Sequence, residues 1–211
     1  MKGKLIIISS PSGGGKGTLI KEVLKRIPNL AYSVSMTTRA RRPGEEDGRD
    51  YNFVTKEQFE AFRAEGGFLE YAEVHDYCYG TSAALTGQLI DAGNDVILEI
   101  DVQGAATVME KVTDAVSIFI LPPSFEALAE RLRRRATEDD AQLDLRLRNS
   151  FGEVSRFNEF EYVVINDNVP DAVARLECVI LGERQRRARQ TEAIQDILIS
   201  FDTSKQSLRR D

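Results

Sequence analysis

The stretch KLIIISSPSGGGKGT, residues 4–18, joins a run of β-branched and apolar residues directly to a glycine-rich turn that contains a lysine. Short apolar runs of this kind are typical of strands buried in a parallel sheet. An apolar stripe at helical spacing follows the turn; its members are Leu19, Ile20, Val23, Leu24 and Ile27. The stretch therefore predicts a strand, a glycine-rich loop and a helix in immediate succession.

Strand, glycine-rich turn, lysine and helix in this order form the pattern of a phosphate-binding loop, or P-loop. Glycines let successive backbone N–H groups face inward, and the helix N-terminus adds a partial positive charge. We expect this loop to hold a polyphosphate, with Lys16 on its β- and γ-phosphates. The alternative is a flexible turn without a ligand. The predicted loop residues are Ser10, Pro11, Ser12, Gly13, Gly14, Gly15, Lys16, Gly17 and Thr18.

The loop departs from the common pattern G-x-x-x-x-G-K-[ST] at both ends, where Ser10 replaces the first glycine and Gly17 replaces the last Ser or Thr. Gly17 removes the hydroxyl that usually contacts Mg²⁺, and Thr18 supplies the next one. In this respect the loop resembles that of the adenylate kinases. We therefore expect no direct protein ligand for the metal, with Thr18 and Asp101 reaching it only through water.

Three further apolar runs, Asp95–Asp101, Val116–Leu121 and Tyr162–Asn166, alternate with helical patterns along the chain. Alternating strands and helices predict an α/β fold with a parallel sheet flanked by helices. Pro170 suits the first position of a C-terminal helix. A last apolar stripe predicts a second helix there, docked on the core; its members are Ile194, Ile197, Leu198 and Phe201.

Residues 36–87 break this alternation, because they are rich in Gly, Tyr and charged residues. We interpret them as an inserted subdomain, with residues 1–35 and 88–211 forming the core. Thr55 and Gln58 have the spacing of a capping box, which predicts one helix inside the insertion. The insertion is therefore expected to be mixed α/β.

The composition is that of an ordinary globular protein, with 42% hydrophobic and 29% charged residues. A net charge of −6 argues against nucleic-acid binding through the overall field. Two cysteines without CxxC spacing favour a reducing compartment. At the start of the chain only residues 5–8 are continuously apolar, too few for a signal core or a membrane span. The expectation is a cytoplasmic protein without a nucleic-acid or membrane partner.

Further motifs follow one another in order along the chain: SVSMTTRARRPGE (33–45), GRDYNF (48–53), FLEYAEV (68–74), YGT (79–81), ILEIDVQG (97–104), FILPPS (119–124) and VIND (164–167). Together they resemble the bacterial guanylate kinases, whose pattern is S-x-T-T-R-x-x-R-x-G-E followed by G-x-x-Y-x-F. The resemblance covers roughly residues 3–187. It implies a P-loop NTPase-type core with a GMP-binding insertion and a short lid at about residues 136–147. The implied reaction transfers the γ-phosphoryl group of ATP to GMP or dGMP, with Mg²⁺ as cofactor.

By the same resemblance, the phosphate of GMP is held by Arg39, Arg42, Tyr51 and Tyr79. Guanidinium groups suit a phosphate because each can donate two parallel charge-assisted hydrogen bonds. Without the resemblance, the basic run at residues 39–42 would be interpreted as a solvated turn.

Guanine would be selected by Glu70, which matches the family's base-binding carboxylate. Guanine carries two adjacent donors, N1–H and N2–H₂, whereas adenine has an acceptor at N1. A carboxylate therefore accepts from guanine and repels adenine. The hydroxyls of Ser35 and Thr81 could donate to O6. The alternative is that Glu70 is an ordinary exposed carboxylate.

Glu99 and Asp101 match two further acidic positions near the GMP, at the end of a predicted strand where ligands of open α/β sheets gather. Asp101 is expected to contact either the guanine or a water-bound Mg²⁺. In a strand both side chains would face the same way. The alternative for Asp101 is that it caps the next helix.

Arg131, Arg135 and Arg146 match the family's lid arginines, which close over ATP. Asn166 matches a position near the adenine of ATP, although an Asn in a turn is an equally simple explanation. With Lys16 and Arg39, these arginines are the predicted catalytic residues.

No general base is expected, because the phosphate of GMP, with its second pKa of about 6, is largely dianionic at neutral pH. Two rival functions remain at this point: a non-catalytic guanylate-kinase-like domain that binds proteins, and a P-loop kinase for another phosphorylated acceptor. Retention of Lys16 and of the lid arginines favours an enzyme. Monomer and homo-oligomer both remain open.

Overall fold

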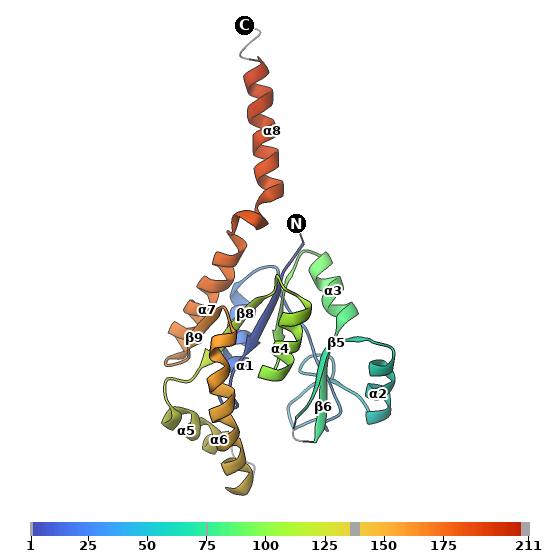
Figure 1. Ribbon diagram of the computed structural model, residues 1–211, viewed down its shortest axis with the longest axis vertical. Helices are drawn as coiled ribbons and strands as arrows, with labels where there is room; N and C mark the ends of the chain where they lie inside the picture. Colours follow the sequence, from blue (N-terminus) through green and yellow to red (C-terminus); the bar gives the residue numbers. More distant parts are fainter. Residues whose placement is uncertain (1, 75, 136–139, 208–211) are drawn as a thin grey trace.

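The computed structural model describes residues 2–74, 76–135 and 140–207. A five-stranded sheet forms the centre of the molecule, and all of its neighbouring strands are parallel (Figure 1). Across the sheet the strands are β2 (Leu30–Tyr32), β7 (Asp95–Glu99), β1 (Leu5–Ser9), β8 (Val116–Leu121) and β9 (Tyr162–Ile165). The predicted α/β class with a parallel sheet is confirmed. The short strand β2 was not predicted.

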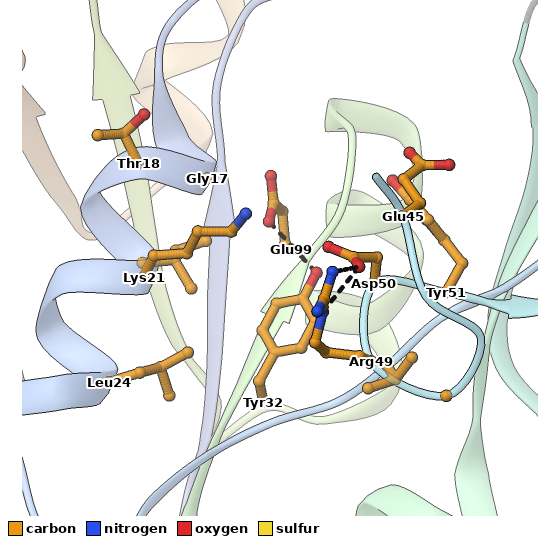
Figure 2. A pocket seen from close by; sticks show the side chains of 13 residues that line it. Gly17, Thr18, Lys21, Leu24, Tyr32, Glu45, Arg49, Asp50, Tyr51 and Glu99 are labelled. Atoms are coloured by element: carbon orange, nitrogen blue, oxygen red, sulfur yellow. Dashed lines mark hydrogen bonds and ion pairs between the residues drawn. The ribbon is translucent and has the colours of Figure 1, made fainter. Parts of the chain in front are cut away.

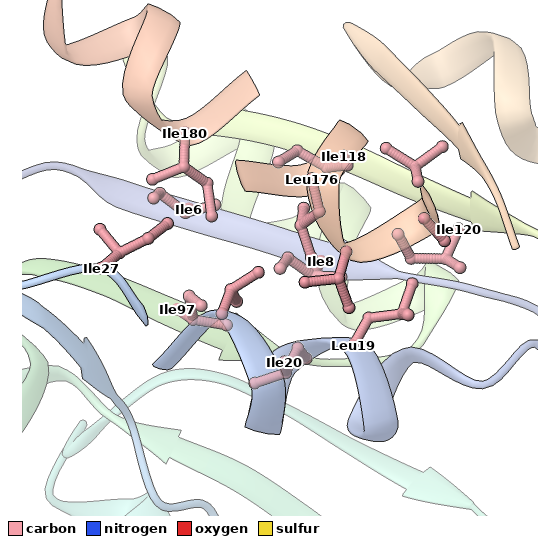
Figure 3. Close-up of a cluster of buried hydrophobic side chains, with 14 of the residues drawn as sticks. Ile6, Ile8, Leu19, Ile20, Ile27, Ile97, Ile118, Ile120, Leu176 and Ile180 are labelled. Carbon is pink, nitrogen blue, oxygen red and sulfur yellow. The ribbon is translucent and has the colours of Figure 1, made fainter. Parts of the chain in front are cut away.

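The two faces of strand β1 belong to two separate hydrophobic layers, because successive side chains of a strand point to opposite sides. Ile6 and Ile8 pack with α1 (Lys16–Arg26) and α7 (Val169–Arg184), as Figure 3 shows. Leu5 and Ile7 pack on the other side with α4 (Val102–Lys111). Each such fully buried aliphatic side chain stabilises the fold by roughly 1.5–3 kcal/mol. The central strand is therefore a rigid support for the loop that follows it.

A second, four-stranded sheet is built entirely from residues 36–82. Its order is β4 (Asn52–Phe53), β3 (Met36–Thr37), β6 (Tyr77–Ser82) and β5 (Phe68–Val74). β3 pairs with β4 in parallel, and the other two pairings are antiparallel.

Helix α2 (Lys56–Ala64) covers this second sheet, and α3 (Ala83–Asp91) leads from it back to the core. The ring of Phe59 from α2 packs 4.5 Å from that of Phe68 in β5. The predicted capping box at the start of α2 is confirmed. The Thr55 hydroxyl accepts from the Gln58 N–H, and the Gln58 side chain accepts from the Thr55 N–H.

Two helices lie beside the glycine-rich loop, α5 (Phe125–Arg135) and α6 (Asp140–Val154), followed by the 3₁₀ helix η1 (Ser155–Glu159). The rings of Phe125 and Phe151 stack 5.0 Å apart and join the two helices. Part of the predicted lid, residues 136–139, lies outside the described residues. Its remainder, residues 140–147, forms the first half of α6.

The expectation that the last helix docks on the core is wrong. Helix α8 (Thr191–Ser207) extends away from the body of the molecule (Figure 1), and its Ile197 and Phe201 side chains are 55% and 71% exposed. The segment before it is anchored by ion pairs of Arg184 and Arg189 with the buried carboxylate of Asp95. A stripe of apolar residues predicts a helix, but it does not say which surface covers that stripe. No helix among the described residues is long and apolar enough to cross a membrane.

Candidate active site

The glycine-rich loop connects the central strand β1 to helix α1 and has the backbone shape of a P-loop. Gly13 and Gly15 adopt φ values of +84° and +89°, which L-residues rarely adopt. A Cβ on Gly15 would also lie 2.4 Å from Nδ2 of Asn166. The first N–H groups of α1 have no acceptors within the helix, so the loop presents donors at the helix N-terminus.

The lysine of the loop faces an acidic side chain from the neighbouring strand. Nζ of Lys16 lies 4.0 Å from Oε1 of Glu99. A Cβ on Gly17 would lie 3.3 Å from the same oxygen, so Glu99 fills the space that a Ser or Thr side chain would need there. The hydroxyl of Tyr32 donates to Oε2 of Glu99 at 3.3 Å, and burial raises the pKa of Tyr32. Glu99 is thus held between two donors, one of which, Tyr32, the sequence did not reveal.

One side of the loop borders a pocket of ≈330 Å³, which is lined by Gly13, Gly15, Thr18, Arg131, Arg134, Asn166 and Val169. Arg131 donates to the carbonyls of Gly14 (3.3 Å) and Asn166 (2.7 Å). The Asn166 amide nitrogen also donates to the Gly14 carbonyl, at 2.9 Å. The buried Oδ1 of Asn166 has no hydrogen-bond partner in the part of the chain that the structure describes. Arg131 and Asn166 are thus brought to the loop together.

A second arginine reaches the loop from α6. Nη2 of Arg146 lies 2.9 Å from Oγ of Ser12. The main-chain N–H of Ser12 donates to Oε2 of Glu153 at 2.8 Å, an acid for which the sequence suggested no role. The side chain of the third predicted lid residue, Arg135, lies outside the described residues.

A second pocket, of ≈160 Å³, lies next to the loop. It is lined by Lys16 and by six of the nine residues predicted to bind GMP: Ser35, Tyr51, Glu70, Tyr79, Glu99 and Asp101. A wider cleft of ≈720 Å³ shares Tyr51 and Glu99 with it. In Figure 2 this cleft separates Lys21 on α1 from Arg49 and Asp50 on the facing loop. The second pocket therefore opens toward the space between the core and residues 45–51.

Glu70 is buried, with 4% of its surface exposed, and the alternative of an ordinary exposed carboxylate is wrong. Burial, with the nearby charge of Asp101, raises its pKa to about 7 although Thr81 donates a hydrogen bond to it. That bond, Oγ1 to Oε1, is 2.6 Å long, so the Thr81 hydroxyl is committed to Glu70 rather than free for a base. A Cβ on Gly104 would lie 2.8 Å from Oε2 of Glu70, so a larger residue there would displace the carboxylate from this position. The sequence did not reveal this role of Gly104.

Arg39 and Arg42 differ in their surroundings. Arg39 is 8% exposed, donates to Oε1 of Glu45 at 2.7 Å and lies over the ring of Tyr51. Only the main chain of Arg42 is held, by Oε2 of the same Glu45 at 2.8 Å, and its side chain is exposed. A solvated turn is therefore the wrong description of Arg39. Glu45 organises both residues, although its place in the motif did not show how.

The expectation that Glu99 and Asp101 share one strand is wrong, because β7 ends at Glu99. Asp101 is the N-cap of α4, where its Oδ1 accepts from the N–H groups of Gln103 (2.9 Å) and Gly104 (2.7 Å). A helix start leaves backbone N–H groups without partners, and an aspartate satisfies them there. The capping alternative is thus confirmed, although both acids still line the second pocket.

A parallel sheet with a P-loop on its central strand, two arginines bound to that loop and a second polar pocket beside its lysine define a P-loop-type kinase. Comparison with known proteins narrows this class. The family model described as guanylate kinase matches residues 2–183.

Individual relatives agree with that match. A guanylate kinase of Thermotoga maritima is 45% identical over 195 residues, which are 92% of this chain and 94% of the relative. One from Chromohalobacter salexigens is 49% identical over 89% of this chain and 87% of its own length. The crystal structure of guanylate kinase from Anaplasma phagocytophilum superimposes with a TM-score of 0.75 at 34% identity, covering 89% of each chain. This chain belongs to the guanylate kinase family, whose reaction is phosphoryl transfer from ATP to GMP.

Proposed function

We propose that this chain transfers the γ-phosphoryl group of ATP to GMP, giving ADP and GDP. The observation that carries the proposal is a buried carboxylate, Glu70, in a pocket that the P-loop lysine Lys16 also lines. A guanine held by Glu70 would place its 5′-phosphate toward the loop that holds the donor. The acceptor and donor phosphates then meet at Lys16.

The acceptor base is recognised by Glu70. Its two carboxylate oxygens accept from N1–H and N2–H₂ of guanine, whereas adenine would place an acceptor against them. Thr81 orients the carboxylate through its 2.6 Å hydrogen bond. Ser35, on the wall of the same pocket, supplies a hydroxyl for O6.

The acceptor phosphate binds to Arg39, Tyr51 and Tyr79, with Arg42 joining when its loop moves inward. Glu45 holds the guanidinium of Arg39 and the main chain of Arg42 in the free protein. Burial, with the nearby charge of Glu99, raises the pKa of Tyr51 to about 12, so its hydroxyl stays protonated and donates. We propose that residues 36–87 move as the GMP-binding unit, which narrows the cleft of ≈720 Å³.

The donor is ATP, with its phosphates on the P-loop residues 10–18 and its base near Asn166. The Asn166 amide nitrogen already faces the carbonyl of Gly14, which can only accept, so Oδ1 is the atom left for a ligand. The 6-amino group of adenine donates to such an oxygen, whereas O6 of guanine would face it as a second acceptor. The site should therefore prefer ATP to GTP.

Transfer needs no general base, because the attacking oxygen of GMP already carries charge near neutral pH. When ATP binds, Lys16 leaves its ion pair with Glu99 and contacts the β- and γ-phosphates instead. Arg131, Arg135 and Arg146 neutralise the charge on the phosphoryl group in flight, and Arg39 holds the nucleophile in line with it. Closure over both substrates excludes water, which would otherwise accept the phosphoryl group.

The residues around Gly17 fit a hydrated Mg²⁺ that arrives with ATP. The carboxylate of Glu99 occupies the space of the missing side chain at Gly17, and Asp101 and Thr18 offer further oxygens. Within residues 2–74, 76–135 and 140–207, no group of three or more metal-ligating side chains comes together. Mg²⁺ would thus be held by the phosphates, with these side chains reaching it through water. A bound Mg²⁺ would neutralise part of the negative charge on the phosphates of ATP.

The rival, a non-catalytic domain that binds other proteins, has no need for arginines against the loop or for a buried base-binding carboxylate. A coupled assay of the purified protein with ATP and GMP, AMP, CMP or UMP separates the two. We expect turnover with GMP and little with the others. No turnover with GMP would overturn the proposal. We further propose that the protein works in the cytoplasm, as a monomer or homo-oligomer without a nucleic-acid or membrane partner.

A further inference from the structure

Ser12 of the P-loop is contacted by two side chains of helix α6 at once. Its main-chain N–H donates to Oε2 of Glu153 at 2.8 Å, and its Oγ accepts from Nη2 and Nε of Arg146 at 2.9 and 3.2 Å. Arg146 and Glu153 are seven residues apart, which is about two helical turns, so they lie on one face of α6. Ser12 is thus hydrogen-bonded to two side chains that lie two turns apart on the same helix.

Among the described residues, these hydrogen bonds link α6 to the loop. Elsewhere α6 packs mainly against η1 and α5, its neighbours along the chain. A hydrogen bond from a main-chain N–H to a carboxylate is among the stronger kinds, because the acceptor is charged. Glu153 also occupies the N–H of Ser12, so the donor phosphates have to use the N–H groups from Gly13 onward.

We propose that Glu153 is a positioning residue for phosphoryl transfer, which holds α6 on the P-loop and so keeps Arg146 beside the donor phosphates. The inference rests on the proposed function. Arg146 has to exchange the Ser12 hydroxyl for the γ-phosphate when ATP binds, because an anionic oxygen is the better acceptor for a guanidinium. The bond between Glu153 and the Ser12 main chain involves no ligand atom and persists through that exchange. It therefore fixes the distance from the helix to the loop while the arginine changes partner.

The test compares Glu153→Ala, Glu153→Gln and Asn149→Ala, the last being an exposed polar residue on the same helix, outside the predicted lid, that serves as a control. Loss of the charged hydrogen bond in Glu153→Ala should lower kcat and raise the KM for ATP, together roughly tenfold or more in kcat/KM, with the KM for GMP unchanged. Glu153→Gln keeps an oxygen for the Ser12 N–H and should stay within about threefold of the parent protein. Asn149→Ala should match the parent protein.

A double-mutant cycle with Arg146→Ala tests whether Glu153 acts through that arginine. If it does, Arg146→Ala lowers kcat/KM for ATP less in the Glu153→Ala background than in the parent protein, because Arg146 is then already misplaced. Additive effects, or equal rises in the KM values for both substrates, overturn the inference. So does a Glu153→Ala protein that behaves like Asn149→Ala.

Folding and function are kept apart in this experiment. The melting temperature of each variant is measured, and if Glu153→Ala does not fold, Glu153→Asp takes its place in every comparison. That variant keeps the charge but is too short to reach Ser12, so it should show the same donor-side defect. Calorimetric titration with ATP gives a readout independent of turnover. Absence of ATP-to-GMP transfer in the parent protein contradicts the proposed function, whereas normal transfer with an indifferent Glu153 contradicts only this inference.

Discussion

The hydroxyl of Thr81 lies 2.6 Å from Oε1 of Glu70, and Gly104 leaves space for the other carboxylate oxygen. The carboxylate is therefore fixed in orientation before any ligand is present, although its burial costs free energy. A base that offers two adjacent donors compensates for that cost, and a base that offers an acceptor does not. In the proposed function, selection of guanine would thus depend on a carboxylate whose charged form is destabilised by burial.

Glu70→Gln should weaken this selection, because an amide offers one acceptor and one donor where guanine needs two acceptors. By analogy with bidentate base readout, the variant should lose about 1–3 kcal/mol of transition-state stabilisation with GMP, seen as a lower kcat/KM. The kcat/KM for AMP should not fall. The measurement is kcat/KM for both nucleotides. Glu73→Gln, an exposed acid on the same strand, serves as control. An unchanged preference for GMP over AMP would show that Glu70 does not select the base.

The raised pKa of Glu70 also predicts how stability depends on pH. Its pKa is about 7 in the folded protein against 4.5 for the unperturbed group, so between these values the folded state keeps a proton that the unfolded state has lost. The contribution of Glu70 to the free energy of unfolding is present below pH 4.5 and is lost as pH rises through 7. Glu70→Gln does not titrate, so its stability relative to the parent protein should rise between pH 5 and 8, by roughly 1–3 kcal/mol. Urea denaturation at several pH values measures this difference, and a pH-independent difference contradicts the raised pKa.

Lys16→Ala should abolish turnover and leave GMP binding nearly intact. Lys16 belongs to the P-loop, whereas the pocket proposed for the acceptor is lined mainly by residues of the second sheet and by the ends of β7 and α4. Turnover is measured by the coupled assay, and GMP affinity by calorimetry. Lys25→Ala, at an exposed position of the same helix, should behave like the parent protein. Comparable ATP-dependent turnover in Lys16→Ala would refute the P-loop assignment.

Asn166→Ala should reduce the preference for ATP over GTP as donor. The substitution removes both the unpaired Oδ1 and the hydrogen bond to the Gly14 carbonyl. The KM for ATP should therefore rise by about tenfold, which corresponds to the free energy of one or two hydrogen bonds. The KM for GMP should not change. Asn168→Ala is the control, because this neighbouring Asn is exposed and its side chain does not cap α7. An unaltered ratio of ATP to GTP activity would place the adenine elsewhere.

Removal of residues 191–211 should leave kcat and both KM values unchanged. The described part of α8 lines neither pocket beside the P-loop, and its apolar side chains are exposed rather than packed on the core. The anchor at Asp95 uses Arg184 and Arg189, which the truncated chain retains. Steady-state kinetics and the melting temperature check this expectation. A loss of activity or a lower melting temperature would mean that α8 supports the core after all.

Several structural features follow from short-range sequence signals. The run Lys4–Ser9 is apolar enough to be buried on both faces, and a capping box can be read from Thr55 and Gln58 alone. By contrast, the sequence favoured a strand end over a helix cap for Asp101. Its place was decided by the unpaired N–H groups of Gln103 and Gly104.

The helix positions of Ile197 and Phe201 were predictable in the same way, but their exposure was not. Amphipathic periodicity states which side chains share a face of a helix. It carries no information about whether another part of the chain reaches that face. The direction in which α8 leaves the short 3₁₀ helix η2 (Arg187–Arg189) is set by how the preceding elements pack.

Short-range patterns in the amino-acid sequence were enough to predict the parallel α/β core and the P-loop. Its motifs also indicated the family and most of the residues that line the two neighbouring pockets. Only the tertiary structure decided that Glu153 accepts a hydrogen bond from Ser12, 141 positions away in the chain, and that Glu45 accepts one from Arg39. It also decided that the carboxylate of Glu70 lies in the space beside Gly104. The reason is physical. A hydrogen bond or a steric gap depends on two atoms meeting within a few tenths of an ångström, and for residues far apart in the chain that meeting is set by how the intervening elements pack.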